Sequence, residues 1–192
     1  VNPVTNVTTL SRPRVPDEAR FNSAGLFIQN AWQAIPDRLR ITGALRYGGM
    51  RYSAKGSDAP IVAGRPLWAS DSLSTADWSG RLGMVARLAR QFRIAFNYGR
   101  GFRYPSMTDL GTLGLTGDGF EVDYLASQRL GGTIGTTAGT DAVSTGIPVA
   151  KQRSETSQNF DFSIRYENRR FDTEFTAFLL DINSAITKQA LI

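Results

Sequence analysis

The stretch of sequence that decides the fold runs from Phe92 to Tyr104 and reads FRIAFNYGRGFRY. Up to Gly99, large apolar side chains occupy every second position, and the positions between them hold small or polar residues. The apolar positions are Phe92, Ile94, Phe96 and Tyr98. Successive side chains of a β-strand point to opposite faces, so this period of two predicts a strand with one apolar and one polar side.

The same alternation recurs before and after this stretch, in segments of about ten residues. The apolar positions of these segments are Leu26, Ile28 and Trp32; Leu39, Ile41, Leu45 and Tyr47; Trp78, Leu82, Met84 and Leu88; Phe160, Phe162, Ile164 and Tyr166; and Phe171, Phe175 and Leu179. Phe27 breaks the pattern of the first segment. Short turns near Pro36, Arg90 and Asn168 join the segments in pairs, which predicts about six long strands in three hairpins.

The connections between the predicted hairpins are long, at about 54–76 and 104–157. Loops of more than about 15 residues are uncommon in compact soluble domains. Short turns at one rim and long loops at the other are typical of a transmembrane β-barrel, whose short side is periplasmic. The alternative is a soluble β-sandwich, but its strands are usually only about 5–6 residues long. We therefore predict an all-β fold, an antiparallel up-and-down transmembrane β-barrel to which residues 1–192 contribute a partial barrel, with both long loops extracellular.

The composition limits the chemistry that this chain can perform. It contains no Cys and no His, which removes disulfides, thiolate nucleophiles, the commonest general base and most transition-metal ligation. The net charge of +5 comes from single arginines spread along the chain. We therefore expect no enzyme activity, no cofactor, no metal site and no nucleic-acid partner. The mean hydropathy of −0.23 reveals no membrane helix, but barrel strands also have an average hydropathy that looks soluble.

Four phrases of the sequence follow one another in a recognisable order. They are the turn PDRL at Pro36–Leu39, YGRGFRYPS at Tyr98–Ser106, ETSQNFD at Glu155–Asp161 and DINSAI at Asp181–Ile186. In this order they resemble the periplasmic turn, the Gly-Phe-Arg-x-Pro-Ser strand end, the Pro-Glu-x-Ser-x-x-Tyr-Glu strand entry and the Asp-Ile-x-x-x-Ile close of TonB-dependent receptors. The third phrase departs from the family at Ser154, Phe160 and Asp161, where the family has Pro, Tyr and Glu. The resemblance covers roughly residues 24–186, although 111–150 match no family phrase.

The resemblance implies a barrel of about 22 strands around a plugged lumen. Six strands cannot close alone, because the smallest bacterial barrels have about eight. We therefore expect the chain to belong to the C-terminal half of a longer barrel, with the plug domain and the TonB-recruiting segment outside it. The implied function is TonB-dependent active uptake of a scarce nutrient of the siderophore, cobalamin or glycan type across the cell outer membrane. The implied partners are outer-membrane lipid and lipopolysaccharide, the plug domain, TonB and a small-molecule nutrient. The alternative is a passive outer-membrane pore or an outer-membrane enzyme on a similar barrel.

Two groups of residues are candidates for functional contacts. The charged residues on the polar sides of the strands are expected to face the lumen, where they contact a plug or cargo or else neutralise one another across the wall. They are Arg40, Arg46, Arg81, Arg87, Arg93, Asp161, Arg165, Asp172 and Glu174. The long loop is either a ligand-capturing surface or a variable loop without a ligand role. Its candidates for ligand contact are Arg103, Tyr104, Asp118, Glu121, Asp123, Tyr124 and Arg129. The three acidic residues could instead form a calcium cluster, but they lack the regular spacing of an EF-hand loop.

Overall fold

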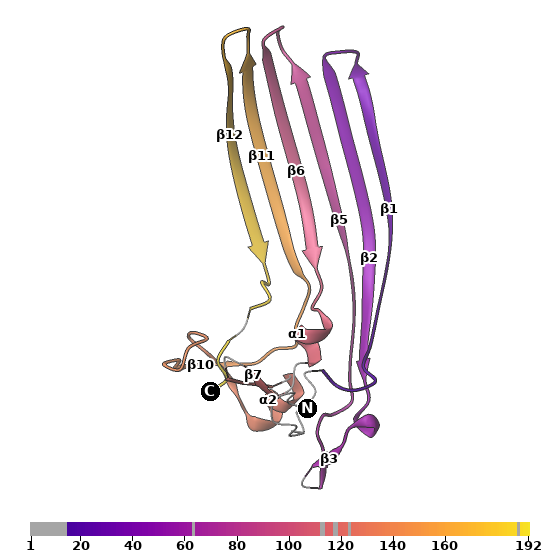
Figure 1. Ribbon diagram of the computed structural model, residues 1–192, viewed down its shortest axis with the longest axis vertical. Helices are drawn as coiled ribbons and strands as arrows, with labels where there is room; N and C mark the ends of the chain where they lie inside the picture. Colours follow the sequence, from indigo (N-terminus) through magenta and orange to yellow (C-terminus); the bar gives the residue numbers. More distant parts are fainter. Residues whose placement is uncertain (1–14, 63, 112–113, 117–118, 123, 188) are drawn as a thin grey trace, which may run out of the picture.

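Six long strands form a single antiparallel sheet in the computed structural model, in the order in which they follow one another along the chain (Figure 1). The structure describes residues 15–192 except 63, 112–113, 117–118, 123 and 188. The long strands are β1 (Arg20–Ile35), β2 (Leu39–Ala54), β5 (Asp71–Arg87), β6 (Phe92–Arg103), β11 (Glu155–Glu167) and β12 (Asp172–Asn183). This confirms the predicted all-β, up-and-down arrangement in three hairpins, and the sheet is open, as expected for part of a barrel.

Tight turns close the three hairpins at one end of the sheet. Between β1 and β2, Asp37 adopts a left-handed backbone conformation (φ 57°), and the Arg38 amide donates to the Ile35 carbonyl at 3.0 Å. Asp tolerates this conformation better than most residues. Between β11 and β12, the side-chain oxygen of Asn168 accepts a hydrogen bond from the Arg170 amide at 2.7 Å. Polar turn residues therefore determine where each strand reverses.

The pairing register places the predicted apolar positions of all six strands on one side of the sheet. Residues directly opposite each other in antiparallel strands share a face. One row across the whole sheet consists of Trp32, Ile41, Met84, Phe96, Phe162 and Ala177. The next row, on the other side, consists of Ala31, Thr42, Gly83, Asn97, Asp161 and Phe178. We call the two sides the apolar face and the polar face.

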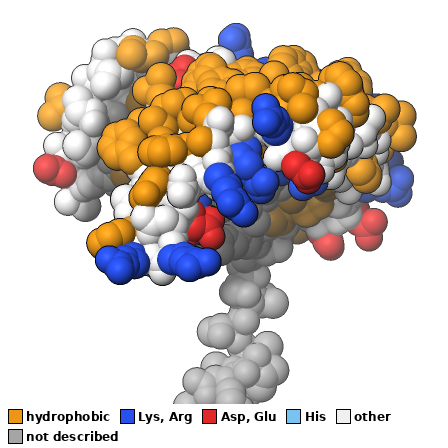
Figure 2. Space-filling view, turned by 90° about the horizontal axis from the view of Figure 1, so that it is seen from above, with side chains coloured by type: hydrophobic (Ala, Val, Ile, Leu, Met, Phe, Trp, Pro, Cys, Tyr) orange, Lys and Arg blue, Asp and Glu red, His pale blue; other side chains and the backbone are white. Residues whose placement is uncertain are grey.

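The apolar face has no covering layer within the described part of the chain. Figure 2 views the sheet from its turn end and shows hydrophobic side chains gathered along one side. Leu26 is 83% exposed, Phe175 66% and Trp32 63%. Folded soluble monomers rarely expose apolar patches larger than a few hundred Å², so this face requires an apolar environment. The other described sheets have only two strands each, so the described residues do not form the β-sandwich that was considered as the alternative.

The long connections lie together at the end of the sheet opposite the tight turns (Figure 1). The first contains η1 (Gly56–Asp58), β3 (Ile61–Val62) and β4 (Arg65–Pro66). The second contains α1 (Met107–Gly111), β7 (Gly114–Thr116), β8 (Gly119–Glu121), α2 (Tyr124–Leu130), β9 (Thr133–Gly135) and β10 (Ser144–Pro148). The first connection is shorter than the expected 54–76, because β5 already begins at Asp71 and its first residues lack strong apolar alternation. In the described part of the chain, no helix is both long and apolar enough to cross a membrane.

Phe96 and Asn97 are adjacent on β6 and provide a matched test of the two faces. In the receptor that contains this chain, Phe96→Arg places a cation in the middle of the apolar face. We expect it to reduce the free energy of unfolding from a bilayer by about 2–4 kcal/mol. Asn97→Arg places the same charge on the polar face, opposite Asp161, and should change that free energy by less than about 1 kcal/mol. Denaturant titration in phospholipid vesicles measures both. Equal losses in the two variants would contradict the assignment of the faces.

Candidate functional site

The polar face carries all the charged side chains that the sequence placed on one side of the strands. The register brings them to one side of the sheet: Arg40, Arg46, Arg81, Arg87, Arg93, Asp161, Arg165, Asp172 and Glu174. The two signs are unevenly distributed within this predicted set, because its three carboxylates are all on β11 and β12. This face is the candidate site, and its two halves differ in how far they neutralise their own charge.

On β6, β11 and β12 the polar face neutralises itself near the tight turns. Arg165 binds Asp172 through two hydrogen bonds, Nε to Oδ1 at 2.9 Å and Nη2 to Oδ2 at 2.5 Å. Arg93 and Glu167 form a longer ion pair of 3.4 Å. Exposed ion pairs contribute about 1 kcal/mol or less each. These contacts therefore position the charges and add little to the stability of the fold.

On β2 and β5 the polar face remains positively charged. Four of its guanidinium groups make no ion pair with any described residue, namely those of Arg40, Arg46, Arg81 and Arg87. The two carboxylates of β5 on this face already have partners. Asp71 binds the Lys151 ammonium at 2.9 Å, and Asp77 binds the Arg100 guanidinium at 2.9 Å. Ion pairs among the described residues therefore leave the positive charge of this half unneutralised.

Arg46 and Arg81 border a shallow depression of about 430 Å³. Its lining residues are Phe27, Ala44, Leu45, Arg46, Ser79, Gly80, Arg81 and Arg100. Arg46 faces Ser79 and Arg81 faces Ala44, so the two arginines are diagonal neighbours, and such neighbours lie about 7–8 Å apart. Phe27, the residue that broke the sequence pattern, lies opposite Arg46 on this face and is 79% exposed. Guanidinium groups only donate hydrogen bonds, so the depression suits an anionic group next to an apolar one.

Two glycines leave room for the Arg46 side chain to lie along the polar face. Gly25 and Gly48 pair across β1 and β2. The Arg46 Nε lies 3.2 Å from the position that a Cβ at Gly25 would take, and the Tyr104 hydroxyl lies 3.2 Å from the corresponding position at Gly48. A side chain at either glycine would displace Arg46 or Tyr104. The glycine pair therefore keeps the margin of the depression open.

Arg100 forms hydrogen bonds to β5 at the point where the β5–β6 ladder ends. That ladder pairs Gly80 with Arg100 and extends no further toward the long connections. The Arg100 guanidinium donates to the Asp77 carboxylate at 2.9 and 3.3 Å, donates to the Trp78 carbonyl and lies 4.4 Å from the centre of the Trp78 ring. A backbone carbonyl without a strand partner needs another donor. Arg100 supplies that donor at the point where β5 and β6 separate.

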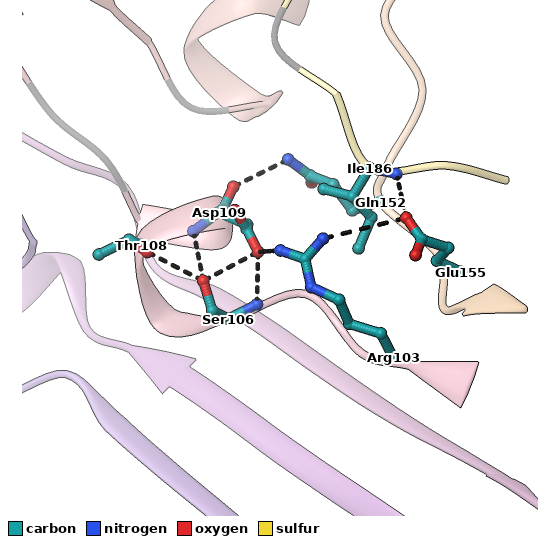
Figure 3. Close-up of polar contacts among 7 residues, drawn as sticks. All are labelled: Arg103, Ser106, Thr108, Asp109, Gln152, Glu155 and Ile186. Atoms are coloured by element: carbon teal, nitrogen blue, oxygen red, sulfur yellow. Dashed lines mark hydrogen bonds and ion pairs between the residues drawn. The ribbon is translucent and has the colours of Figure 1, made fainter. Parts of the chain in front are cut away.

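Just after β6 the chain enters α1 through a reciprocal pair of capping hydrogen bonds (Figure 3). The Ser106 hydroxyl accepts from the Asp109 amide at 3.2 Å, and the Asp109 carboxylate accepts from the Ser106 amide at 2.8 Å. This is a capping box in which Asp occupies the position usually held by Glu or Gln. The Pro-Ser phrase that marked a strand end in the sequence therefore also begins a helix.

Arg103 connects this capped turn to two other stretches of the chain (Figure 3). Its Nη2 donates to Asp109 Oδ2 at 3.0 Å, and its Nη1 lies 3.9 Å from Glu155 Oε2. The same Glu155 oxygen accepts the Ile186 amide at 3.0 Å. The Gln152 side chain donates to the Asp109 carbonyl at 3.0 Å. We call these five residues the clasp, because they hold together the end of β6, α1, the start of β11 and the segment after β12.

Helix α1 also packs onto the polar face near the long connections. Met50 and Tyr52 are on the polar face of β2 and are buried, and Leu110 of α1 is buried against them. Tyr104 and Met107 pack against the same cluster. The start of the second long connection thus folds over the polar face. This apolar cluster and the clasp fix α1 from two sides.

The predicted ligand-contacting residues fall in different parts of the second connection. Arg103 belongs to the clasp, and Tyr104 packs on the polar face. Tyr124 and Arg129 are on α2, where Tyr124 is half-buried and Arg129 is exposed. Glu121 ends β8. The remaining candidates are Asp118 and Asp123, which lie outside the described residues. The calcium hypothesis also depends on these two residues.

An apolar strip that the sequence pattern did not predict lies on the polar face of β12. Phe178, Leu180 and Ile182 are 76%, 53% and 50% exposed, and the register places them on the polar face. The signal was the run AFLLDI, in which both faces of the strand become apolar. The capping role of Asp109 was also not predicted, although its spacing of three residues from Ser106 is a signal for it.

One continuous apolar face, a charged opposite face, tight turns at one end and long connections at the other define part of a membrane-spanning, up-and-down β-barrel. Residues 1–192 match the family described as TonB dependent receptor-like, beta-barrel, and the chain belongs to this family. The match confirms the resemblance stated from the four sequence phrases. No curated protein matches the chain.

Solved structures similar to this chain include one described as "Copper transporter OprC", with a TM-score of 0.55 and 18% identity over 85% of this chain and 21% of that chain. Another is described as the ferric yersiniabactin uptake receptor FyuA from Yersinia pestis, with a TM-score of 0.49 and 16% identity over 85% of this chain and 20% of that chain. The chain therefore spans about a fifth of the length of these structures. At 18% identity, the similarity to OprC supports the barrel fold.

Removing the Asp109 carboxylate should loosen the capped turn. In the receptor that contains this chain, we expect Asp109→Ala to destabilise the turn by about 1 kcal/mol, because the Ser106 amide and the Arg103 guanidinium lose their acceptor. Hydrogen exchange should then be about fivefold faster at the Ser106 and Asp109 amides. Asp109→Glu restores the usual capping box and should recover most of the protection. Unchanged exchange in Asp109→Ala would contradict this role.

Proposed function

We propose that this chain forms wall and outer loops of a bacterial outer-membrane receptor that takes up a scarce nutrient in a TonB-dependent manner. Membership of the TonB-dependent receptor family supports this proposal. The observation that carries it is the depression between Arg46 and Arg81, whose positive charge has no partner among the described residues. In this proposal the polar face lines the lumen and is available to cargo. The tight turns face the periplasm, and the long connections face the medium.

The apolar face provides the membrane contact in this proposal. On β2 the apolar positions extend from Leu39 to Tyr47, which is about 27 Å along the strand at about 3.4 Å per residue. A strand tilt of about 40° reduces this to a height of about 21 Å, close to the lipid-facing band of about 25 Å in outer-membrane barrels. The proposed partners on this face are the hydrocarbon of outer-membrane lipid and lipopolysaccharide. Trp78 and Tyr47 would then lie at the outer interface.

The other partners lie on the polar side. A plug domain would contact the polar face, and TonB would act on the plug from the periplasmic end. We propose a nutrient of the siderophore, cobalamin or glycan class, which enters past α1 and α2. An anionic part of the nutrient would meet Arg46 and Arg81, while Phe27 would contact an apolar part. The second long connection would provide the first contacts, with Arg129 exposed on α2.

The second long connection should be required for capture of the nutrient. We expect deletion of Gly111–Ala150 from the receptor to abolish nutrient binding and to leave barrel assembly intact, because the six-stranded sheet pairs without this segment. Binding and uptake of labelled ferric siderophore, cobalamin and oligosaccharide by whole cells measure the effect. Uptake that remains unchanged after the deletion would contradict the role of the loop. A passive pore on the same barrel makes a different prediction, because its uptake would persist in cells that lack TonB.

The absence of Cys in the chain permits a direct test of which face is wet. Arg81→Cys is on the polar face and Leu82→Cys on the apolar face of β5. With the plug removed from the receptor, we expect a charged, membrane-impermeant maleimide to label Arg81→Cys at least about tenfold faster, because thiolates react in water and hydrocarbon excludes the reagent. Mass spectrometry of cells labelled for timed intervals measures both rates. Faster labelling of Leu82→Cys would overturn the assignment of the polar face to the lumen.

A further inference from the structure

A polar and cationic patch lies on the apolar face, beyond the aromatic residues nearest to the long connections. Tyr47 and Trp78 face each other in the last large apolar row of β2 and β5. Past this row the side chains of β1, β2 and β5 on the same face become small, then polar. The register gives rows of Ala24, Gly49 and Ala76; of Asn22, Arg51 and Ser74; and of Arg20, Ser53 and Ser72. We call the last two rows the rim patch.

The arginines of the rim patch have no carboxylate partner. Arg20 and Arg51 are exposed, and neither forms an ion pair with any residue in the described ranges. Lys55 follows β2 with an extended backbone (φ −106°, ψ 127°) and therefore continues on the same face as Arg51. Asp17 and Glu18 precede β1, but neither carboxylate pairs with Arg20. The rim patch thus combines positive charge with hydroxyl and amide donors and holds no acidic residue.

The rim patch begins at the outer margin of the lipid headgroup layer when the apolar face contacts the bilayer. Arg51 lies four residues beyond Tyr47, which is about 14 Å along the strand and about 10 Å along the membrane normal at a tilt of about 40°. The headgroup layer on each side of the hydrocarbon is about 5–8 Å thick. An arginine side chain can reach back toward that layer with its charged end. Arg20 faces Ser53, two residues further out than Arg51, which places it about 16 Å beyond Tyr47 along the normal. A phosphate group that both arginines bind therefore lies at the outer margin of the headgroup layer, within reach of their long side chains.

Beyond their last large apolar row, β6, β11 and β12 carry no unpaired cation on the apolar face within the described residues. On β11 and β12 the apolar face ends in Gln158 and Asp181, which face each other. Arg100 faces Gln158 across β6 and β11, but its guanidinium is bound to Asp77. Among the described residues of the six long strands, the unpaired positive charge beyond the aromatic row of this face therefore lies on β1 and β2.

We propose that Arg20 and Arg51, assisted by Lys55, bind a phosphate group on the headgroup of an outer-leaflet lipid. This inference rests on the membrane placement in the proposed function but not on TonB or on any nutrient. Guanidinium groups bind phosphate oxygens through paired, charge-assisted hydrogen bonds, and the serines of the rim patch can donate to remaining oxygens. A cargo or plug on the polar side cannot reach these residues, because they are on the opposite face of the sheet. The lipid headgroup is therefore the occupant, with its acyl chains along Tyr47 and Trp78.

The experiment compares lipopolysaccharide, dephosphorylated lipopolysaccharide and inorganic phosphate, each added to the delipidated receptor that contains this chain. Thermal unfolding measures stabilisation, and native mass spectrometry counts bound lipid. We expect only phosphorylated lipopolysaccharide to stabilise the receptor at micromolar concentrations. In Arg20→Gln/Arg51→Gln, the concentration for half-maximal stabilisation should rise by at least about tenfold, because two charged hydrogen-bonding groups are lost.

Two matched variants control this experiment. Arg169→Gln/Arg170→Gln removes the same charge from exposed residues in the β11–β12 turn at the opposite rim, and its lipid response should equal that of the unchanged receptor. Arg20→Lys/Arg51→Lys keeps the charge and should bind lipid with intermediate strength, because Lys lacks the paired donors. These two variants separate loss of the site from general loss of charge or of folding.

Three results would overturn the proposal. One is equal stabilisation by phosphorylated and dephosphorylated lipopolysaccharide, since contact would then involve acyl chains or sugars only. Another is stabilisation by inorganic phosphate at the same concentrations, which would indicate a free-anion site. The last is an unchanged lipid response in Arg20→Gln/Arg51→Gln. TonB-dependent uptake is measured separately, in whole cells. If the unchanged receptor shows no such uptake, the proposed function fails, but lipid binding to the purified receptor still tests this proposal.

Discussion

The constraint on which the structure depends is the register of the six-stranded sheet. Inside a bilayer every backbone amide and carbonyl must be hydrogen-bonded within the protein, so the strands must pair continuously. Because side chains alternate between the two faces, a slip of one residue would exchange the faces of a whole strand. On β6, such a slip would place Arg93 in lipid and Phe96 on the polar face. The turn residues Asp37 and Asn168 fix where the strands reverse, and so a few polar side chains determine the sidedness of the sheet.

The same register determines which charges neutralise each other. On β11 and β12 it brings Arg165 within reach of Asp172. On β2 and β5 it places Arg46 and Arg81 diagonally, while the acids of that half are bound to Lys151 and Arg100. The strand register thus brings positively charged side chains together without placing free carboxylates beside them. Like charges left close together on a sheet are unfavourable unless an opposite charge approaches. The positive half of the polar face is therefore the part of the sheet that an approaching anionic group would stabilise most.

The sequence predicted the strands and their two faces well, because alternation over about ten residues leaves few other structures for Phe92–Tyr98 or Phe160–Tyr166. It predicted less where a strand leaves the bilayer, since lipid no longer enforces the pattern there. The start of β5 was missed because Asp71–Thr75 contain mainly small polar residues. The apolar cluster on the polar face was missed for a second reason. Tyr52 and Leu110 are distant in the sequence, and only the folded connection brings them together. Arg103 is a predicted ligand contact, and its local spacing does not reveal that its guanidinium group also bridges Asp109 and Glu155.

Where β5 and β6 stop pairing, side chains attach the sheet to the second long connection. Where the ladder ends, Arg100 donates to the Trp78 carbonyl, and a little further along Lys151 donates to the Ser72 carbonyl at 2.7 Å. Two cationic side chains thus take the place of strand amides along the edge of β5. Since Lys151 is adjacent to Gln152 of the clasp, the same short segment holds β5 and α1. Both ends of the second long connection are therefore fixed to the sheet, by the Glu155–Arg103 pair of the β6–β11 ladder and by the side chains of Lys151 and Gln152. Sequence change between these ends can then alter the contacts of the connection without moving the register of the six long strands.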